Sequence, residues 1–201
     1  MRRIVGITGG IGSGKSVVSR ILRLKGYEVY DCDSQAKSMM DSSERILSGI
    51  RSFFGDEAFN PDGSLCRPYL SARVFADSEK LSFLNSLVHV EVLEDFGTRA
   101  AGEGGVLFVE SAIMRTSGLD GLCSEMWLVS APDAVRIGRV LERDSVSPDE
   151  VESRMKRQIG EYDFSGSLTV RVIQNDGVSP LLPQIDRLLQ EIGKNNSNNK
   201  K

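Results

Sequence analysis

The chain has 201 residues, of which 40% are hydrophobic, and its formal net charge is -3. This length suffices for one α/β core with a small appended subdomain, and the charge argues against a nucleic-acid footprint. Three scattered cysteines without a C-x-x-C pair are typical of a reduced cytosolic chain. Met1-Arg2-Arg3 leads directly into an apolar run, so we expect no signal peptide, no membrane-spanning segment and a cytoplasmic location.

The first motif is Gly9 to Ser16, which fits the phosphate-binding pattern G-x-x-x-x-G-K-[ST]. The apolar run Ile4–Ile7 before it predicts a strand, and the apolar stripe after it, closed by Gly26, predicts a helix. In this setting the backbone N–H groups and the helix N-terminus favour phosphate. The alternative is a glycine-rich turn that binds nothing. The expected nucleotide-binding residues in this stretch are Gly9, Gly10, Ile11, Gly12, Ser13, Gly14, Lys15, Ser16 and Val17.

Within the motif, two side chains have distinct expected tasks. Lys15 should bridge the β- and γ-phosphates of a nucleotide, and the Ser16 hydroxyl should hold Mg²⁺. A dinucleotide site is disfavoured, because no G-x-G-x-x-G pattern occurs here and a lysine follows the last glycine.

Two acids follow the second predicted strand, Glu28–Tyr30. Ligands of open parallel sheets bind beyond the carboxyl ends of the strands, so we expect Asp31 and Asp33 beside the phosphate loop. If the strand persists, the two side chains point the same way. Alternatively, Asp33 caps the helix that follows, and capping would account for one of the two acids.

No strong strand signal occurs from Ser34 to about Gly104. Apolar spacing predicts helices around 34–54, 69–77, 79–87 and 89–101. About 70 residues is too long for a simple strand-to-strand crossover, so we interpret 34–104 as an inserted helical subdomain that binds a substrate. Arg67 and the only histidine, His89, lie in it, and either capping or core packing is an alternative role for His89.

Three further strands are predicted. Gly105–Val109 is a continuous apolar run typical of a central parallel strand, and Met126–Val129 is a fourth strand. Val170–Ile173 alternates and should be less covered. The last helix should run from 179 to 193, and the polar segment 194–201 should be a disordered tail.

A basic helical hairpin, 132–160, lies between the fourth and fifth strands. Arg136, Arg139 and Arg143 share one helical face, and Ser147 begins a capping box for the second helix. We interpret the hairpin as a lid whose arginines neutralise a transferring phosphoryl group. A solvated, salt-bridged hairpin is the alternative.

These elements predict an α/β fold of the P-loop NTPase type, with a five-stranded parallel sheet sandwiched by helices. The nucleotide-binding core would comprise 1–33 and 105–193, with the helical insertion at 34–104 and the lid within the core.

The ordered set of motifs resembles the dephospho-coenzyme A kinase family from Ile4 to Leu189. The residues that carry the resemblance are Thr8 to Ser16, Asp31-Cys32-Asp33 with Ala36, Asp62-Gly63 with Arg67, Leu84-Asn85 with His89, Pro132, Arg139, Arg143-Asp144, Arg154, Gln158, Asn175 and Gly177. The chain departs from the family pattern at Cys32, Cys66 and Val90, and the Ala-Asp expected after Gln158 is absent.

The resemblance implies transfer of the ATP γ-phosphate, with Mg²⁺, to the 3′-hydroxyl of dephospho-coenzyme A. It implies that Asp33 is the base or orients the attacking hydroxyl, with Lys15 also catalytic, and that Arg139 and Arg143 contact phosphates or clamp the adenine. Asn175 and Gly177 are implied to hold the adenine edge. Asp31, Arg67 and His89 are the implied acceptor-binding residues. The expected partners are these two small molecules, without nucleic acid or membrane, for a monomer or weak oligomer.

The residues by themselves leave other functions open. A kinase for another small metabolite or nucleotide would share the layout. A P-loop GTPase switch is disfavoured, because no Asn-Lys-x-Asp occurs and no apolar strand ends in Asp-x-x-Gly. A catalytically dead nucleotide-binding scaffold is disfavoured by the intact Lys15, Ser16 and Asp33.

Overall fold

The computed structural model describes residues 2–164 and 168–198. The chain forms two compact units: a helical unit, 31–103, and a sheet unit, made of residues 2–30 and the described residues from 104 onward. The helical unit begins at Asp31, slightly before the start expected at Ser34. No helix among the described residues combines the length and the apolar character needed to cross a membrane.

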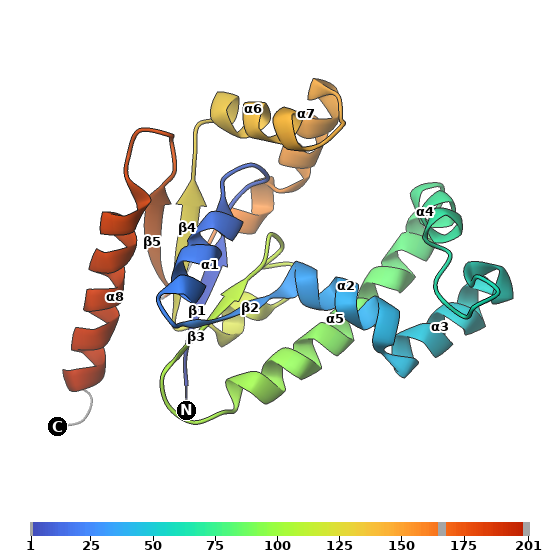
Figure 1. The fold of residues 1–201 in the computed structure, drawn as a ribbon, viewed down its shortest axis with the longest axis horizontal. Helices are drawn as coiled ribbons and strands as arrows, with labels where there is room; N and C mark the ends of the chain where they lie inside the picture. The colour runs from blue at the N-terminus through green and yellow to red at the C-terminus, as the bar shows by residue number, and fades with distance from the viewer. Residues whose placement is uncertain (1, 165–167, 199–201) are drawn as a thin grey trace. The chain divides into compact units, whose positions relative to one another are not determined.

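The sheet unit is built on a five-stranded sheet with the order β2-β3-β1-β4-β5 (Figure 1). The strands are β1 (Arg3–Thr8), β2 (Glu28–Asp31), β3 (Val106–Glu110), β4 (Glu125–Ser130) and β5 (Thr169–Gln174). β1 pairs in parallel with both β3 and β4, and β4 pairs in parallel with β5. The five predicted strands and the α/β fold are confirmed.

Burial along the strands follows their position in the sheet. The central strands β1 and β3 are almost wholly buried at their carboxyl ends, as their continuous apolar sequences predict. β5 lies at one edge, and Val170 and Val172 are exposed on it. An edge strand is less covered by other elements, so exposed and buried side chains alternate along it instead of forming a continuous apolar run. The sequence predicted this for β5.

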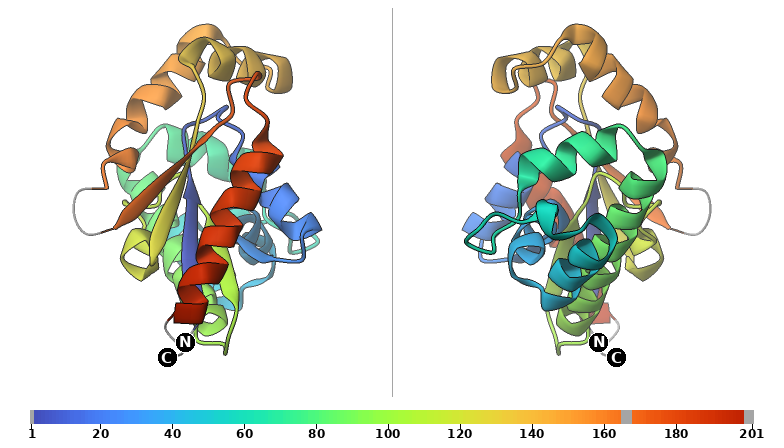
Figure 2. Two further views of the ribbon diagram at one scale, coloured as in Figure 1. Left: turned by 90° about the vertical axis from the view of Figure 1, so that its left-hand side faces the viewer. Right: turned by 90° about the vertical axis from the view of Figure 1, so that its right-hand side faces the viewer.

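Helices cover the sheet and extend beyond the ends of its strands. They are α1 (Lys15–Leu24), α6 (Asp133–Arg143), α7 (Pro148–Arg157) and α8 (Leu181–Asn198), with 3₁₀ turns η2 (Leu119–Leu122) and η3 (Ile159–Tyr162). α1 and α8 pack together on the sheet, and Figure 2 shows α8 running along it. The core between them is centred on Phe108 and Trp127, whose rings are 5.1 Å apart. Burial of these large side chains is the main force that holds the unit together.

The carboxyl-terminal helix corrects one expectation. The sequence predicted a disordered tail from residue 194, but α8 continues to Asn198. Ile185, Leu188 and Ile192 anchor the helix in the core, and each further residue of an existing helix adds one backbone hydrogen bond. Residues 199–201 of the predicted tail lie outside the described residues.

The helical unit contains four α-helices and a 3₁₀ turn among the described residues. They are α2 (Cys32–Ser42), α3 (Glu44–Phe54), η1 (Asp56–Ala58), α4 (Arg67–Phe75) and α5 (Ser78–Ala100). The expected helix 34–54 is wrong, because Ser43 has extended backbone and caps α3 by accepting a hydrogen bond from the N–H of Ile46. The expected break near residue 88 is also wrong, since Val88 is buried within the single long helix α5.

Candidate active site

The loop between β1 and α1 has the backbone that its glycines predict. Gly12 and Gly14 have φ angles of 76° and 93°, in the left-handed region that favours glycine. α1 begins directly after Gly14, at Lys15, so the first N–H groups of the helix lie at the end of the loop. Such N–H groups, at the positive end of the helix dipole, attract anions. The structure therefore supports the predicted phosphate-binding loop, which we call the phosphate loop (residues 9–16).

Close packing around the phosphate loop leaves no room for a Cβ atom at Gly10, Gly12 or Gly14. A Cβ atom at Gly14 would lie 2.1 Å from the side-chain nitrogen of Asn175, and one at Gly10 would lie 1.9 Å from the Arg136 guanidinium. At Gly12 a Cβ would meet backbone atoms of Arg136. The glycines therefore let Arg136 and Asn175 pack directly against the loop.

Lys15 lies over the phosphate loop. Its ammonium nitrogen is 2.7 Å from the carbonyl oxygen of Gly9 and 3.4 Å from that of Gly10. These contacts keep the cation at the mouth of the loop, where a phosphate oxygen could replace a carbonyl. Ser16 and Val17, in the first turn of α1, are exposed.

The hairpin α6–α7 contacts the phosphate loop through two of its arginines. The Nε of Arg136 donates to the carbonyl of Ile11 at 3.0 Å, and Arg139 donates more weakly to that of Gly12 at 3.4 Å. α6 and α7 lie beyond the carboxyl ends of β1 and β4, on the side of the phosphate loop (Figure 1). Ser147 and Glu150 form the predicted capping box at the start of α7.

The third arginine of the predicted face is engaged differently. Arg143 makes two hydrogen bonds to Asp144, at 2.8 and 2.9 Å, and its side chain is 64% exposed. The hydrogen bond raises the pKa of Arg143 and lowers the pKa of the Asp144 carboxyl. Arg143 is therefore a charged, exposed group at the end of α6, and the three arginines do not act as one set in this state.

The segment after β5 contacts the phosphate loop as well. The side-chain nitrogen of Asn175 donates to the carbonyl of Ser13 at 2.7 Å, while its backbone N–H donates to the carbonyl of Ser130 at 2.7 Å. Gly177 follows with a φ angle of 88°. Asn175 thus joins the end of β4 to the phosphate loop, a role that the sequence pattern did not indicate.

Gln158, which the sequence pattern names without a role, binds the phosphate loop directly, and Tyr162 binds Gln158. Gln158 accepts a hydrogen bond from the N–H of Ile11 at 2.8 Å and another from the hydroxyl of Tyr162 at 3.1 Å. Burial raises the pKa of Tyr162 to about 12, so this hydroxyl stays protonated and able to donate at neutral pH. Glutamine and tyrosine in a helical region carry no signal of such a contact, and the pairing spans 147 residues of sequence.

In the helical unit, the two predicted acids have different surroundings. Asp31 is the N-cap of α2 and accepts hydrogen bonds from the N–H and hydroxyl of Ser34, at 3.0 and 2.9 Å. Asp33 is exposed in the first turn of the same helix. The capping role expected for Asp33 therefore belongs to Asp31, because the helix begins immediately after it, at Cys32. The strand ends at Asp31 and does not persist to Asp33, so the condition under which both side chains would share a strand face is not met.

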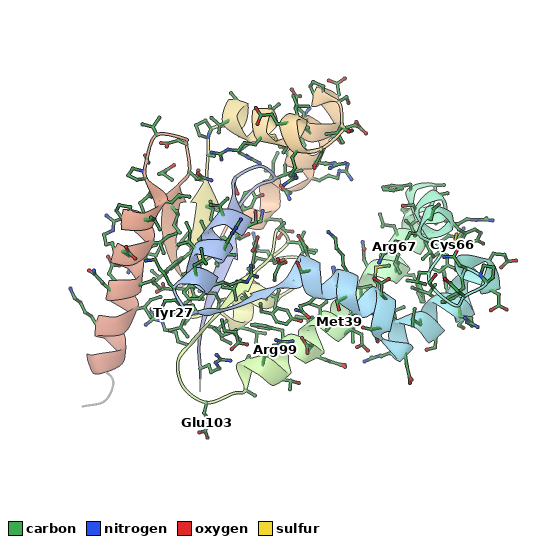
Figure 3. All side chains as sticks on the ribbon, viewed as in Figure 1. Tyr27, Met39, Cys66, Arg67, Arg99 and Glu103 are labelled. Atoms are coloured by element: carbon green, nitrogen blue, oxygen red, sulfur yellow. The ribbon has the colours of Figure 1, made fainter. Side chains whose placement is uncertain are left out.

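The other predicted acceptor residues lie on separate helices of the same unit. Arg67 begins α4 (Figure 3) and forms an ion pair with Asp41 at 2.7 Å, in which both side chains are more than half exposed. His89 is half-buried within α5. Such an exposed pair contributes little to stability.

The sequence matches a known family and its members over most of the chain. The family model described as dephospho-CoA kinase matches residues 3–180. A dephospho-CoA kinase of Porphyromonas gingivalis is 36% identical over 189 residues, which cover 94% of this chain and 93% of the relative. One from Staphylococcus aureus (strain Mu50) is 30% identical over 197 residues, covering 96% and 95%.

Solved structures agree with the sequence matches. A crystal structure of a Thermus thermophilus protein has a TM-score of 0.76 at 32% identity, covering 96% of this chain and 97% of that one. A dephospho-CoA kinase from Campylobacter jejuni has a TM-score of 0.69 at 23% identity, covering 98% and 100%. A shikimate kinase from Aquifex aeolicus shares the fold, with a TM-score of 0.52 at 16% identity, covering 96% of this chain and 97% of that one. With a phosphate loop in place and family matches along nearly its whole length, this chain belongs to the dephospho-CoA kinase family.

Proposed function

We propose that this protein transfers the γ-phosphoryl group of ATP to the 3′-hydroxyl of dephospho-coenzyme A, giving coenzyme A and ADP. The observation that carries the proposal is a complete phosphate loop in a chain that matches the dephospho-CoA kinase family over residues 3–180. Phosphoryl transfer needs positioning and neutralisation of charge more than covalent assistance from the protein.

The phosphate loop binds the triphosphate. The N–H groups at the start of α1 face the anion, and Lys15 exchanges its carbonyl contacts for the β- and γ-phosphates. Asn175, whose side chain binds the carbonyl of Ser13, and Gly177, two residues further on, hold the adenine edge. Together these groups carry the leaving ADP, whose charge rises as the bond to the γ-phosphorus breaks.

The metal fits the exposed hydroxyl of Ser16. Mg²⁺ usually keeps several waters and takes one or two protein ligands together with phosphate oxygens. Ser16 is exposed in the first turn of α1, next to Lys15, and can supply such a ligand. When bound there, the ion neutralises phosphate charge.

Asp33 acts on the acceptor. Its carboxylate is exposed in the first turn of α2, whereas both oxygens of Asp31 bind Ser34. Asp33 is thus the acid that can accept the proton of an attacking hydroxyl and orient it. Arg67 and His89, in the same helical unit, contact the rest of the acceptor, and Asp31 supports Asp33 by fixing the start of α2.

The hairpin α6–α7 serves as a lid. Arg139 already contacts the phosphate loop, and the exposed Arg143 can turn toward the transferring phosphoryl group. Their charges offset the negative charge on the equatorial oxygens in the transition state. The protein works on these two small molecules in the cytoplasm, without nucleic acid or membrane, as a monomer or weak oligomer.

An acceptor panel tests the proposal. ADP release is measured with dephospho-coenzyme A, adenosine, AMP and shikimate at equal concentrations, and the product is identified by its mass and by the ³¹P signal of a 3′-phosphate. Dephospho-coenzyme A should be turned over far better than adenosine or AMP, because its distant groups contribute binding energy for positioning. Equal turnover of AMP would instead identify a nucleotide kinase, the second candidate, which shares the fold.

A further inference from the structure

Between Gly10 and Gly14, each peptide group of the phosphate loop is held by a side chain from outside the loop. The carbonyls of Ile11, Gly12 and Ser13 accept from Arg136, Arg139 and Asn175 in that order. These three acceptors are consecutive in the sequence, while the donors come from α6 and from the segment after β5.

The peptide before them is turned the opposite way. Here the N–H of Ile11 donates to Gln158, at 2.8 Å, and the carbonyl of Gly10 accepts from the N–H of Ser13 at 3.0 Å and from Lys15. Gln158 is in turn oriented by the Tyr162 hydroxyl. The reversal thus turns one carbonyl toward the Lys15 ammonium.

Holding a carbonyl also determines the direction of the next N–H. A peptide group is planar, and among the described residues none is cis, so the C=O of one residue and the N–H of the next point in opposite directions. With the carbonyls of Ile11 and Ser13 held by Arg136 and Asn175, the N–H groups of Gly12 and Gly14 face away from those side chains. Within the described part of the chain, neither N–H donates to another protein group, so both can bind a ligand.

Arg136 is itself held in place. Its side chain is only 14% exposed, and its Nη1 binds Asp133 at 3.0 Å while its Nε binds Ile11. The absence of a Cβ at Gly10 makes room for the guanidinium. A rigid fork with two partners defines an orientation, which a single flexible ammonium cannot do.

We propose that Arg136, Gln158 and Asn175 are positioning residues that set the peptide orientations of the phosphate loop, so that the N–H groups of Gly12 and Gly14 face a polyphosphate. The inference rests on the proposed function for the identity of that ligand, a nucleoside triphosphate. The family resemblance assigns no role to Arg136 or Gln158. In this proposal both act indirectly, by orienting the peptide groups of the phosphate loop.

Binding without an acceptor tests the proposal. Calorimetry of ATP and of inorganic tripolyphosphate is carried out on Arg136→Met, Arg136→Lys and Gln158→Met. We expect Arg136→Met to lower the affinity for both ligands about tenfold, which is about 1.4 kcal/mol of binding free energy. Arg136→Lys should weaken them nearly as much, since lysine keeps the charge but not the two-partner fork. If Arg136→Lys restores full affinity, charge alone is responsible and the proposal is overturned.

Gln158 gives a test in which no charge is removed. Gln158→Met should lower the affinity for tripolyphosphate several-fold and speed amide hydrogen exchange at Ile11. Gln158→Glu keeps a hydrogen-bond acceptor, so it should preserve the protection of that amide. Unchanged affinity in Gln158→Met would contradict the proposal even if the Arg136 variants failed to fold.

Arg157→Met is the matched control on the same hairpin. Arg157 donates to the Ser153 carbonyl of its own helix, so its loss should leave both affinities unchanged. A decrease equal to that of Arg136→Met would show a general charge effect and overturn the proposal. Because no acceptor is present, these outcomes stand whether or not dephospho-coenzyme A proves to be the substrate.

Discussion

The phosphate loop and the helical unit present functional groups in two different ways. In the phosphate loop the proposed ligand-binding groups are backbone N–H groups, and neighbouring side chains bind the carbonyls beside them. In the helical unit the candidate groups are side chains on separate helices, such as Asp33 on α2 and Arg67 on α4, and both are exposed. A phosphate site made of backbone can be encoded by one contiguous motif, whereas an acceptor site made of dispersed side chains cannot.

The sharpest test of this comparison is Asp33→Asn. The amide keeps the size of the side chain and removes its charge, so phosphoryl transfer should fall by roughly 10²–10⁴-fold, the range expected for a positioned general base. ATP affinity should be nearly unchanged if the triphosphate is held by the other unit. Single-turnover rates and calorimetry measure the two effects.

Asp31→Asn is the comparison variant for Asp33. Asparagine also caps helices well, so stability should change little, and the rate should fall less than in Asp33→Asn. If Asp31→Asn proves the more damaging of the two at equal stability, the roles of the acids are exchanged.

Lys15→Ala tests the phosphate loop itself. Loss of the ammonium should remove at least roughly 3 kcal/mol of transition-state stabilisation, measured as kcat/KM for ATP. Lys25→Ala, at the other end of α1, removes an equal charge that is paired with Asp186 and should have little effect. Turnover within tenfold of the parent in Lys15→Ala would show that the loop binds phosphate without this lysine.

Arg143→Ala tests whether an exposed side chain of the sheet unit can matter for rate alone. The rate of phosphoryl transfer should fall by roughly 10- to 100-fold. This loss is smaller than the one expected for an arginine that already contacts the phosphate loop. Stability should change by less than about 0.5 kcal/mol, because the ion pair with Asp144 is exposed and screened by solvent. Urea unfolding measures the stability, and a large loss there would favour a structural, salt-bridged hairpin.

The smallest expected effect concerns Cys123, in the turn before β4. Burial, with a smaller contribution from the Asp120 carboxylate, raises the pKa of this thiol from 9.0 to about 12. The pKa of this thiol is higher in the folded than in the unfolded protein. The contribution of the protonated thiol to the free energy of unfolding is therefore complete below pH 9 and is lost as the pH rises from 9 toward 12. At pH 8 we expect Cys123, which is half-buried, to react with a thiol reagent much more slowly in the folded than in the unfolded protein, as read by peptide mass spectrometry. Labelling of the folded protein as fast as that of the unfolded one would contradict the raised pKa.

Sequence patterns by themselves determined the strands, the phosphate loop and the capping box of α7. Each of these depends on residues close together in the chain: an apolar run, a glycine spacing, or a serine three residues before a glutamate. The local interactions that form them are the same in any globular protein, so their signals can be read directly.

Only the tertiary structure decided which side chains hold the loop and where the helices end. The contacts of Ile11 with Arg136 and Gln158 join residues 125 and 147 positions apart, and no local pattern encodes them. The same holds for α8, which continues past its predicted end because its apolar face is anchored in the core. Packing between distant segments selects among conformations that local propensity leaves nearly equal in free energy, and it does so through groups whose residue types carry no signal by themselves.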